Sequence, residues 1–70
     1  MRQIWEEVLR VPVGDGDSFF ALGGDSLTAV RIVNRVRERL GAALTVLDVF
    51  DAPTVPELTI VAHRTLITVD

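Results

Sequence analysis

The chain has 70 residues, which is enough for one small domain and leaves little surface for an enclosed active site. It is 49% hydrophobic but only 6% aromatic, so its core must consist mainly of Val, Leu, Ile and Ala. The absence of cysteine excludes a disulfide framework and a thiolate metal site, and the single His63 argues against a histidine metal cluster. We therefore predict one domain over residues 1–70 that binds no metal.

The net charge is −3, and every cation is an arginine. Residues 26–40 contain four arginines and one glutamate, so this stretch carries +3 and the remainder carries −6. A nucleic-acid binder of this size is usually basic overall, so we expect no nucleic-acid partner. No apolar run approaches the ~20 residues of a membrane span, and acids stand where a signal peptide would be apolar. These features predict a cytoplasmic domain without a membrane partner, and we expect the domain to be monomeric.

In the first third of the chain, the residue pattern predicts one helix followed by a long loop. Ile4, Trp5, Val8 and Leu9 fall on one face of a helix over residues 2–11, with Trp5 in the core. Residues 12–25 contain four glycines and a proline, which is typical of a loop with at most a short turn at 18–22. We expect both phenylalanines of this loop, at positions 19 and 20, to anchor it to the core.

The clearest helix covers residues 26–40. Asp25 can cap its start, and Gly41 can end it. At 100° per residue one apolar stripe forms, with Val30 at its edge. The stripe contains Ala29, Ile32, Val33, Val36 and Leu40.

Two further helices are predicted by their capping residues. Thr45 with Asp48 three residues later, and Thr54 with Glu57, each form a capping-box pattern. The last helix has an apolar face of Leu58, Val61, Ala62 and Leu66, with His63 partly exposed, and we expect residues 67–70 to fray. The sequence thus predicts an all-α four-helix bundle, in which a long loop joins the first two helices and the third helix is short.

The segment Gly24-Asp25-Ser26-Leu27 matches the signature of a family of serine esterases. A serine nucleophile needs a base within hydrogen-bond reach, and those esterases place an aspartate three residues before their histidine. Here Ile60 stands three residues before the only histidine, and the predicted fold lacks the strands of that family. The esterase hypothesis is therefore disfavoured.

Two interpretations of Ser26 remain open from the residues alone. In the first, the serine and Asp25 simply cap a helix after a glycine turn. In the second, Gly23 and Gly24 remove side chains beside Ser26, so that a large group can reach and modify the hydroxyl. A phosphodiester there would face the positive end of the helix dipole, although Asp25 opposes it. Leu27 lies on the polar side of the helix, either under the loop or as a contact for partners.

The stretch "DSFFALGGDSLTAVRIVNRVRERLG", followed by "VFDAPTVPEL", resembles a peptidyl carrier (thiolation) domain of nonribosomal peptide synthetases, within the acyl-carrier-protein-like superfamily. The resemblance runs from about Ile4 to Leu66 and rests on the double Phe, Leu-Gly-Gly-x-Ser-Leu and Phe-x-x-Pro-Thr. It implies a four-helix bundle and a role in the biosynthesis of antibiotics or other secondary metabolites. It implies that a separate phosphopantetheinyl transferase, with Mg²⁺, attaches 4′-phosphopantetheine from coenzyme A to Ser26. The domain itself would catalyse nothing.

The resemblance also implies partners and a surface that contacts them. The arm would hold an aminoacyl or peptidyl thioester and deliver it to adenylation, condensation, epimerisation, tailoring or thioesterase domains. Gly24 and Asp25 would flank the attachment site. The partner-binding residues would be Leu27, Val30, Arg31, Val46 and Leu47, although Val30 and Val46 also fit an ordinary core and the arginines a solvated face.

Some choices stay open at this point. An acyl or aryl carrier of a polyketide or siderophore pathway is an alternative, which the double glycine, "FDAPT" and the arginine-rich second helix disfavour. A non-enzymatic interaction module is another. Many peptidyl carriers have His before the serine, whereas Asp25, as here, is frequent ahead of epimerisation domains but also occurs elsewhere. The amino acid carried, and whether the domain stands alone, do not follow from the sequence.

Overall fold

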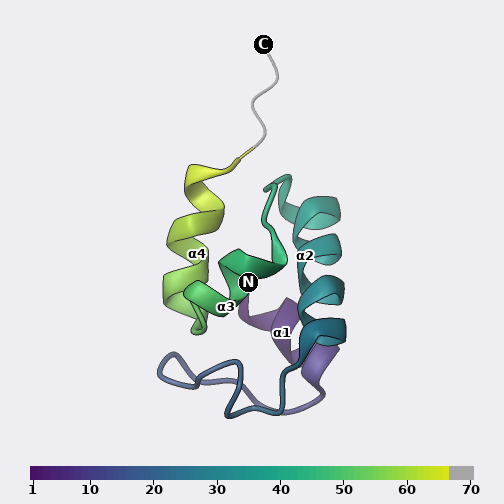
Figure 1. Cartoon of the computed structure of the whole chain (residues 1–70), viewed down its shortest axis with the longest axis vertical. Coiled ribbons are helices and arrows are strands. Elements are labelled where there is room, and N and C mark those ends of the chain that lie inside the picture. Colours follow the sequence, from purple (N-terminus) through teal and green to yellow (C-terminus); the bar gives the residue numbers. More distant parts are fainter. Residues whose placement is uncertain (67–70) are drawn as a thin grey trace.

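The computed structural model describes residues 1–66, and they form four helices. Helix α1 covers Arg2–Leu9, α2 covers Ser26–Leu40, α3 covers Val46–Asp51 and α4 covers Val55–Arg64 (Figure 1). The predicted all-α bundle, with its short third helix and its long first loop, is confirmed. An isolated antiparallel bridge joins Ala42 to Leu66 beyond the end of α4. The predicted fraying of residues 67–70 lies outside the described residues.

None of the helices in residues 1–66 is long and apolar enough to cross a membrane.

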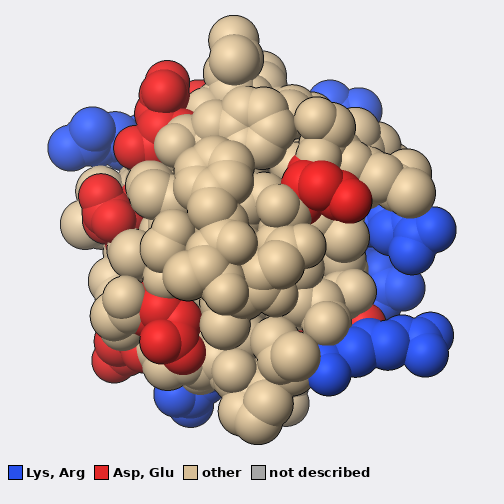
Figure 2. All heavy atoms as spheres, turned by 60° about the horizontal axis from the view of Figure 1, so that its bottom comes forward, with Lys and Arg blue, Asp and Glu red and all other residues tan. Residues whose placement is uncertain are grey.

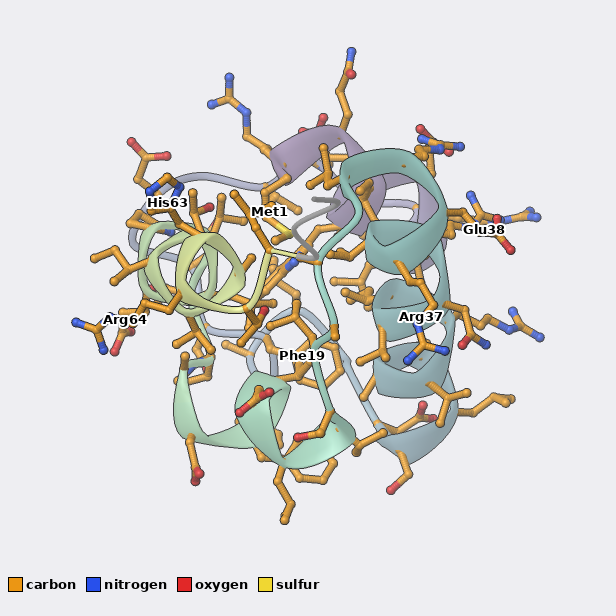
Figure 3. The ribbon with its side chains drawn as sticks, turned by 90° about the horizontal axis from the view of Figure 1, so that it is seen from above. Met1, Phe19, Arg37, Glu38, His63 and Arg64 are labelled. Carbon is orange, nitrogen blue, oxygen red and sulfur yellow. The ribbon has the colours of Figure 1, made fainter. Side chains whose placement is uncertain are left out.

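The core lies between the four helices and the first loop. The predicted burial of Trp5 is confirmed, and Phe19 is buried beside it with the two rings edge to face at 5.7 Å. Seen from above, Phe19 stands in the middle of the ring of helices, whereas Glu38 and Arg64 point outward (Figure 3). The fully buried side chains also include Ile32, Val36, Val49 and Leu58.

Helix α1 ends two residues earlier than its apolar pattern predicted. Its last hydrogen bond runs from the N–H of Arg10 to the carbonyl of Glu6, and Arg10 turns into the left-handed region at φ 60°. Pro12 follows, and the residue before a proline is sterically disfavoured in a helix. The chain therefore leaves α1 at residue 10, and the Glu6 carboxylate accepts the N–H of Val13 at 3.0 Å.

Helix α2 begins and ends where the sequence predicted. Asp25 is its N-cap, and Gly41 ends it in the left-handed conformation at φ 70°, where a residue without Cβ is favoured. Of the predicted apolar stripe, Ala29, Ile32 and Val36 are buried. The prediction was wrong for Leu40, which is 44% exposed at the last position of α2 and lies at the edge of the core.

The two later helices carry the predicted caps, with one difference. Thr45 and Asp48 form a complete capping box at α3. At α4 the hydroxyl of Thr54 accepts the N–H of Glu57 at 3.4 Å, but the Glu57 carboxylate binds that same hydroxyl at 2.7 Å and not the backbone N–H. The helix ends at Arg64, so Leu66 was wrongly assigned to its apolar face and is exposed.

The two phenylalanines of the first loop have different environments. Phe19 anchors the loop, as predicted, whereas Phe20 is 52% exposed and lies over Phe19 and Phe50, with ring centroids 5.5 Å apart in both pairs. Phe19 takes the buried position, and Phe20 packs on its outer side. The predicted turn is present, because the N–H of Leu22 donates to the carbonyl of Ser18 at 3.0 Å.

Candidate functional site

Ser26 is the first residue of α2, at the point where the long loop joins this helix. It is the lower end of α2 in Figure 1, just above the long loop. The side chain is exposed, and none of the hydrogen bonds that cap the helix uses its hydroxyl. A large group can therefore reach Ser26 Oγ without any rearrangement of the helix.

The residues on either side of Ser26 form a reciprocal cap. The N–H of Thr28 donates to Asp25 Oδ1 at 2.9 Å, and the N–H of Asp25 donates to Thr28 Oγ1 at 2.8 Å. The sequence identified Asp25 as the cap but missed Thr28 as its partner, although the Asp-x-x-Thr spacing was visible. The hydrogen bonds from Thr28, together with the Leu27 N–H and the charge of Arg31, lower the pKa of Asp25. A negative charge therefore stands next to Ser26 at neutral pH.

Glycine is required at positions 23 and 24 for two different structural reasons. Gly23 adopts φ 88°, which L-residues with a side chain rarely adopt. Gly24 lies against the ring of Phe19, and a Cβ built on it would come within 2.5 Å of Phe19 Cζ. The expectation that Gly24 leaves open space beside Ser26 was therefore wrong, because a buried aromatic ring already fills that space.

Exposed apolar side chains follow Ser26 on α2 and also occur on α3, which packs against α2. Leu27 is 59% exposed, Val30 is 42% exposed, and Leu47 of α3 is 69% exposed. Leu27, Val30 and the exposed Arg31 stand three and four residues apart, so they share one face of α2. Val46 differs from the others, because it is half-buried and packs against the core.

The sequence analysis missed an aromatic pair on the surface of this domain. Phe20 of the loop and Phe50 of α3 lie with ring centroids 5.5 Å apart, and half of Phe20 is exposed. Both phenylalanines were visible in the sequence motifs, but the sequence does not show which ring is buried in the core and which is exposed.

The charges are divided across this end of the molecule. Figure 2 shows most of the basic side chains along the right edge, on the side of α2, and most of the acidic side chains on the left, where further basic side chains also stand, with mostly uncharged side chains between them. The arginines of α2 are not equivalent, since Arg35 and Arg39 both bind Glu7 of α1, at 2.8 and 2.6 Å. The hydrogen bond from Arg39, with the charges of both arginines, lowers the pKa of Glu7.

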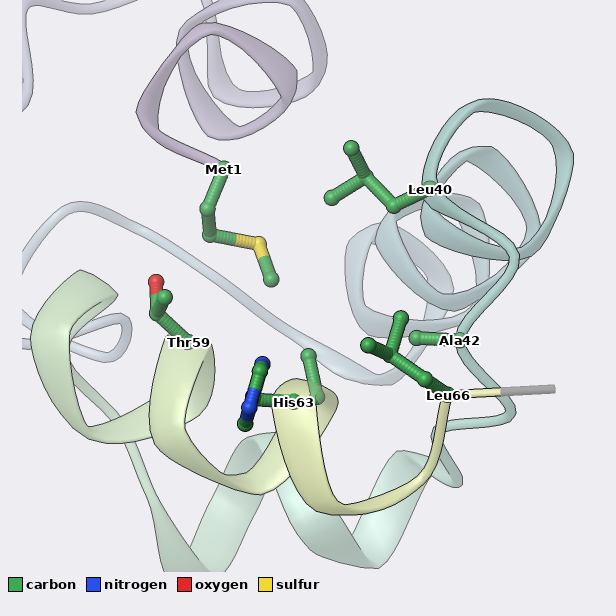
Figure 4. A pocket seen from close by; sticks show the side chains of 7 residues that line it. Met1, Leu40, Ala42, Thr59, His63 and Leu66 are labelled. Atoms are coloured by element: carbon green, nitrogen blue, oxygen red, sulfur yellow. The ribbon is translucent and has the colours of Figure 1, made fainter. Parts of the chain in front are cut away.

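A hollow of about 310 Å³ lies at the other end of α2. Met1, Leu40, Ala42 and Leu66 line it with Thr59 and His63 (Figure 4). The Thr59 hydroxyl already donates to the carbonyl of Val55 at 2.7 Å. His63 is exposed, as predicted. Ser26 and Leu40 are the first and last residues of α2, about 20 Å apart at 1.5 Å per residue, so the hollow is separate from the serine.

Residues 1–61 match the protein family described as "Phosphopantetheine attachment site". The chain belongs to this family. As members of it are carriers that hold a prosthetic group and are not catalysts, this chain is a carrier domain, and the esterase hypothesis is wrong. The cofactor of the family is 4′-phosphopantetheine, as the resemblance implied.

Relatives of the carrier domain are parts of much larger proteins. This chain is 52% identical over 61 residues to nonribosomal peptide synthetase 32 of Fusarium pseudograminearum. The matched region covers 83% of this chain but only 1% of the synthetase. Its fold is similar to that of BlmI, a type-II acyl carrier protein from Streptomyces verticillus involved in bleomycin biosynthesis. The TM-score is 0.84 and the identity 39%, over 94% of this chain and 81% of BlmI.

A second solved structure agrees with this assignment. A docking-domain complex of the Pax nonribosomal peptide synthetase, which contains the T1 domain of PaxA, matches with a TM-score of 0.83 and 26% identity, over 91% of this chain and 62% of that one. The four helices of the carrier domain therefore have the acyl-carrier fold, and its similarity is to carriers of nonribosomal peptide synthesis.

The site fits the cofactor on structural grounds. Ser26 Oγ is an exposed, uncommitted hydroxyl, and hydroxyl groups form phosphodiesters with the pantetheine phosphate. On the N-terminal side of Ser26, Gly24 packs against Phe19 and Asp25 caps α2, and Ser26 itself is exposed. When bound, the cofactor supplies a terminal thiol. The residues of the carrier domain supply its anchor and the surface around it.

Proposed function

We propose that Ser26 is the residue of this carrier domain to which 4′-phosphopantetheine is attached. The exposed hydroxyl at the capped start of α2 is the single observation that carries the proposal. A phosphopantetheinyl transferase with Mg²⁺ joins Ser26 Oγ to the pantetheine phosphate of coenzyme A. The bond from that phosphate to the adenosine bisphosphate breaks, and the hydroxyl proton leaves with the released group.

The thiol of the attached arm then holds an aminoacyl or peptidyl group as a thioester. The domain delivers it to adenylation, condensation, epimerisation or thioesterase domains of a nonribosomal peptide synthetase. A tethered thiol raises the effective concentration of the cargo at each partner without a tight complex. Transfer between successive partners requires small contacts that release readily.

The surface that meets these partners comprises Leu27, Val30, Arg31 and Leu47. The exposure of Leu27 and Val30 on the helix that carries Ser26, and of Leu47 on the neighbouring α3, supports this assignment, because exposed apolar side chains contribute to binding when a partner covers them. Val46 contributes less than the sequence suggested, since it is half-buried. Arg31 offers its charge at the edge of the patch, next to Val30.

The proposal is tested by treating the purified chain with coenzyme A, Mg²⁺ and a promiscuous transferase, and weighing it. We expect a mass gain of one 4′-phosphopantetheine group in the wild type and none in Ser26→Ala. A wild type that stays unmodified, or an equal gain in Ser26→Ala, contradicts the proposal.

A loading experiment on the phosphopantetheine-modified domain distinguishes a peptidyl carrier from an acyl or aryl carrier. The modified domain is offered to adenylation domains that activate amino acids and, in parallel, to enzymes that load acyl or aryl groups. We expect thioester formation with amino acids. Loading with acyl or aryl groups alone would assign the domain to a polyketide or siderophore pathway.

A further inference from the structure

We propose that Phe19 is a positioning residue for Ser26, acting through its contact with Gly24. The inference rests on the proposed attachment of the cofactor to Ser26. It concerns how the buried core determines where the serine hydroxyl stands.

The contact between the two residues leaves no space for a side chain at position 24. A Cβ there would meet three ring atoms of Phe19, Cζ at 2.5 Å and both Cε atoms at 2.6 Å. Such distances are far inside van der Waals contact, so an alanine at this position must displace either the ring or the backbone.

The ring of Phe19 cannot easily move away. It is fully buried and packs edge to face on Trp5 at 5.7 Å and on Phe20 at 5.5 Å, and it lies 6.3 Å from Phe50. These neighbours belong to α1, to the loop and to α3. Close-packed interiors transmit strain of this kind and do not absorb it.

The backbone of Phe19 is held as well. Its N–H donates to the carbonyl of Pro53 between α3 and α4, and its own carbonyl accepts the N–H of Gly24 at 2.9 Å. A displacement forced at position 24 must therefore pass forward along the chain. The next residues are Asp25, which caps α2, and Ser26. The contact between Phe19 and Gly24 thus sets the position of the hydroxyl relative to a transferase docked on the surface.

The experiment measures the rate of phosphopantetheine transfer against the concentration of carrier domain, so that kcat and KM are obtained separately. Gly24→Ala is compared with Gly16→Ala, which adds the same methyl group to the same loop where nothing lies within 4 Å. Phe19→Leu removes the three clashing ring atoms, so the double variant Phe19→Leu/Gly24→Ala tests for rescue.

We expect Gly24→Ala to lower kcat about tenfold or more, because a misplaced nucleophile slows the chemical step. KM should stay near the wild-type value, since the surface at Leu27 and Leu47 is unchanged. Gly16→Ala should behave as the wild type. In the Phe19→Leu background the added methyl should change kcat less than about twofold, as expected for residues in contact.

The inference is overturned if Gly24→Ala keeps the wild-type kcat, or if the Phe19→Leu background does not rescue it. A purely structural effect of Gly24→Ala would reduce the folded fraction and so raise the apparent KM at unchanged kcat. If circular dichroism shows that Gly24→Ala is unfolded, the comparison of Phe19→Leu with the double variant decides, and a tenfold loss there contradicts the proposal. A wild type that is never modified contradicts the proposed function instead, so the two failures are distinguishable.

Discussion

The amide N–H of Asp25 donates to Thr28 Oγ1, and the amide N–H of Thr28 donates to the Asp25 carboxylate, at 2.8 and 2.9 Å. Ser26 lies inside this closed pair, so the first turn of α2 cannot fray without breaking both bonds. The Thr28 hydroxyl also lies 3.0 Å from the carbonyl of Asp25. The helix start that carries the proposed attachment residue is therefore held on both sides of the serine.

The first prediction concerns a variant that lacks the Thr28 hydroxyl of this cap. Thr28→Val keeps the shape of the side chain but leaves the Asp25 N–H without its partner, so we expect Tm to fall by about 4–8 °C. Thr28→Ser retains the hydroxyl and is the matched control, with a smaller loss. Thermal unfolding followed by circular dichroism measures both. Equal Tm values for the wild type and Thr28→Val would show that the Thr28 hydroxyl contributes nothing to stability.

The second prediction concerns acid. Hydrogen bonds from Thr28 lower the pKa of Asp25 below its ordinary 3.8, so its contribution to stability is present above that pH and is lost as the pH falls through the folded-state pKa. Urea unfolding at about pH 6 and about pH 3 should show a lower midpoint at the acid pH. The decrease should be smaller in Thr28→Val. A pH dependence that is the same in both proteins would show that the Thr28 hydroxyl does not lower the pKa of Asp25.

The third prediction concerns the contact between α1 and α2. Glu7 accepts hydrogen bonds from Arg35 and, through both carboxylate oxygens, from Arg39. All three side chains are partly exposed, so we expect Glu7→Gln to lower the denaturation midpoint slightly at low salt, and the difference to vanish near about 1 M salt. Asp15→Asn removes one negative charge from the first loop, where Asp15 makes no hydrogen bond or ion pair with the other residues of the described range 1–66, and is the control. A difference that persists at high salt would show that packing, and not charge, is lost.

The fourth prediction tests the surface around Ser26. Leu27→Ala and Leu47→Ala should each reduce kcat/KM for phosphopantetheine transfer or aminoacyl loading by about tenfold, the effect of losing one well-buried apolar contact in a complex. Ile60→Ala removes a similarly exposed side chain from α4 and should leave kcat/KM unchanged. All three should unfold near the wild-type temperature. An equal loss in the α4 variant would contradict the assigned surface.

Local signals predicted most of the fold, because capping patterns and apolar spacing depend on residues three or four apart. Asp25, Thr45 and Thr54 were found at the starts of their helices for this reason. The early end of α1 was missed, although Pro12 indicated it. The exposure of Leu40 was missed because periodicity does not show where the core ends along a helix.

The site was predicted less completely, because its remaining features are contacts between distant residues. Position 24 requires a glycine because the ring of Phe19 fills the space that a Cβ would need. Phe20 is exposed because Phe19, and not Phe20, is the ring buried in the core. The pairing of Arg35 and Arg39 with Glu7 joins residues 28 and 32 positions apart. Neither kind of contact follows from a pattern within one helix or loop.

The most direct measurement locates the cofactor on the chain. Trypsin cleaves after Arg10 and Arg31, so after treatment with transferase and coenzyme A the peptide of residues 11–31 contains three hydroxyl side chains, at Ser18, Ser26 and Thr28. Fragmentation of this peptide by mass spectrometry assigns the added mass to one of them. We predict one 4′-phosphopantetheine group on Ser26. A group on Ser18 or Thr28, or an unmodified peptide, would contradict the account.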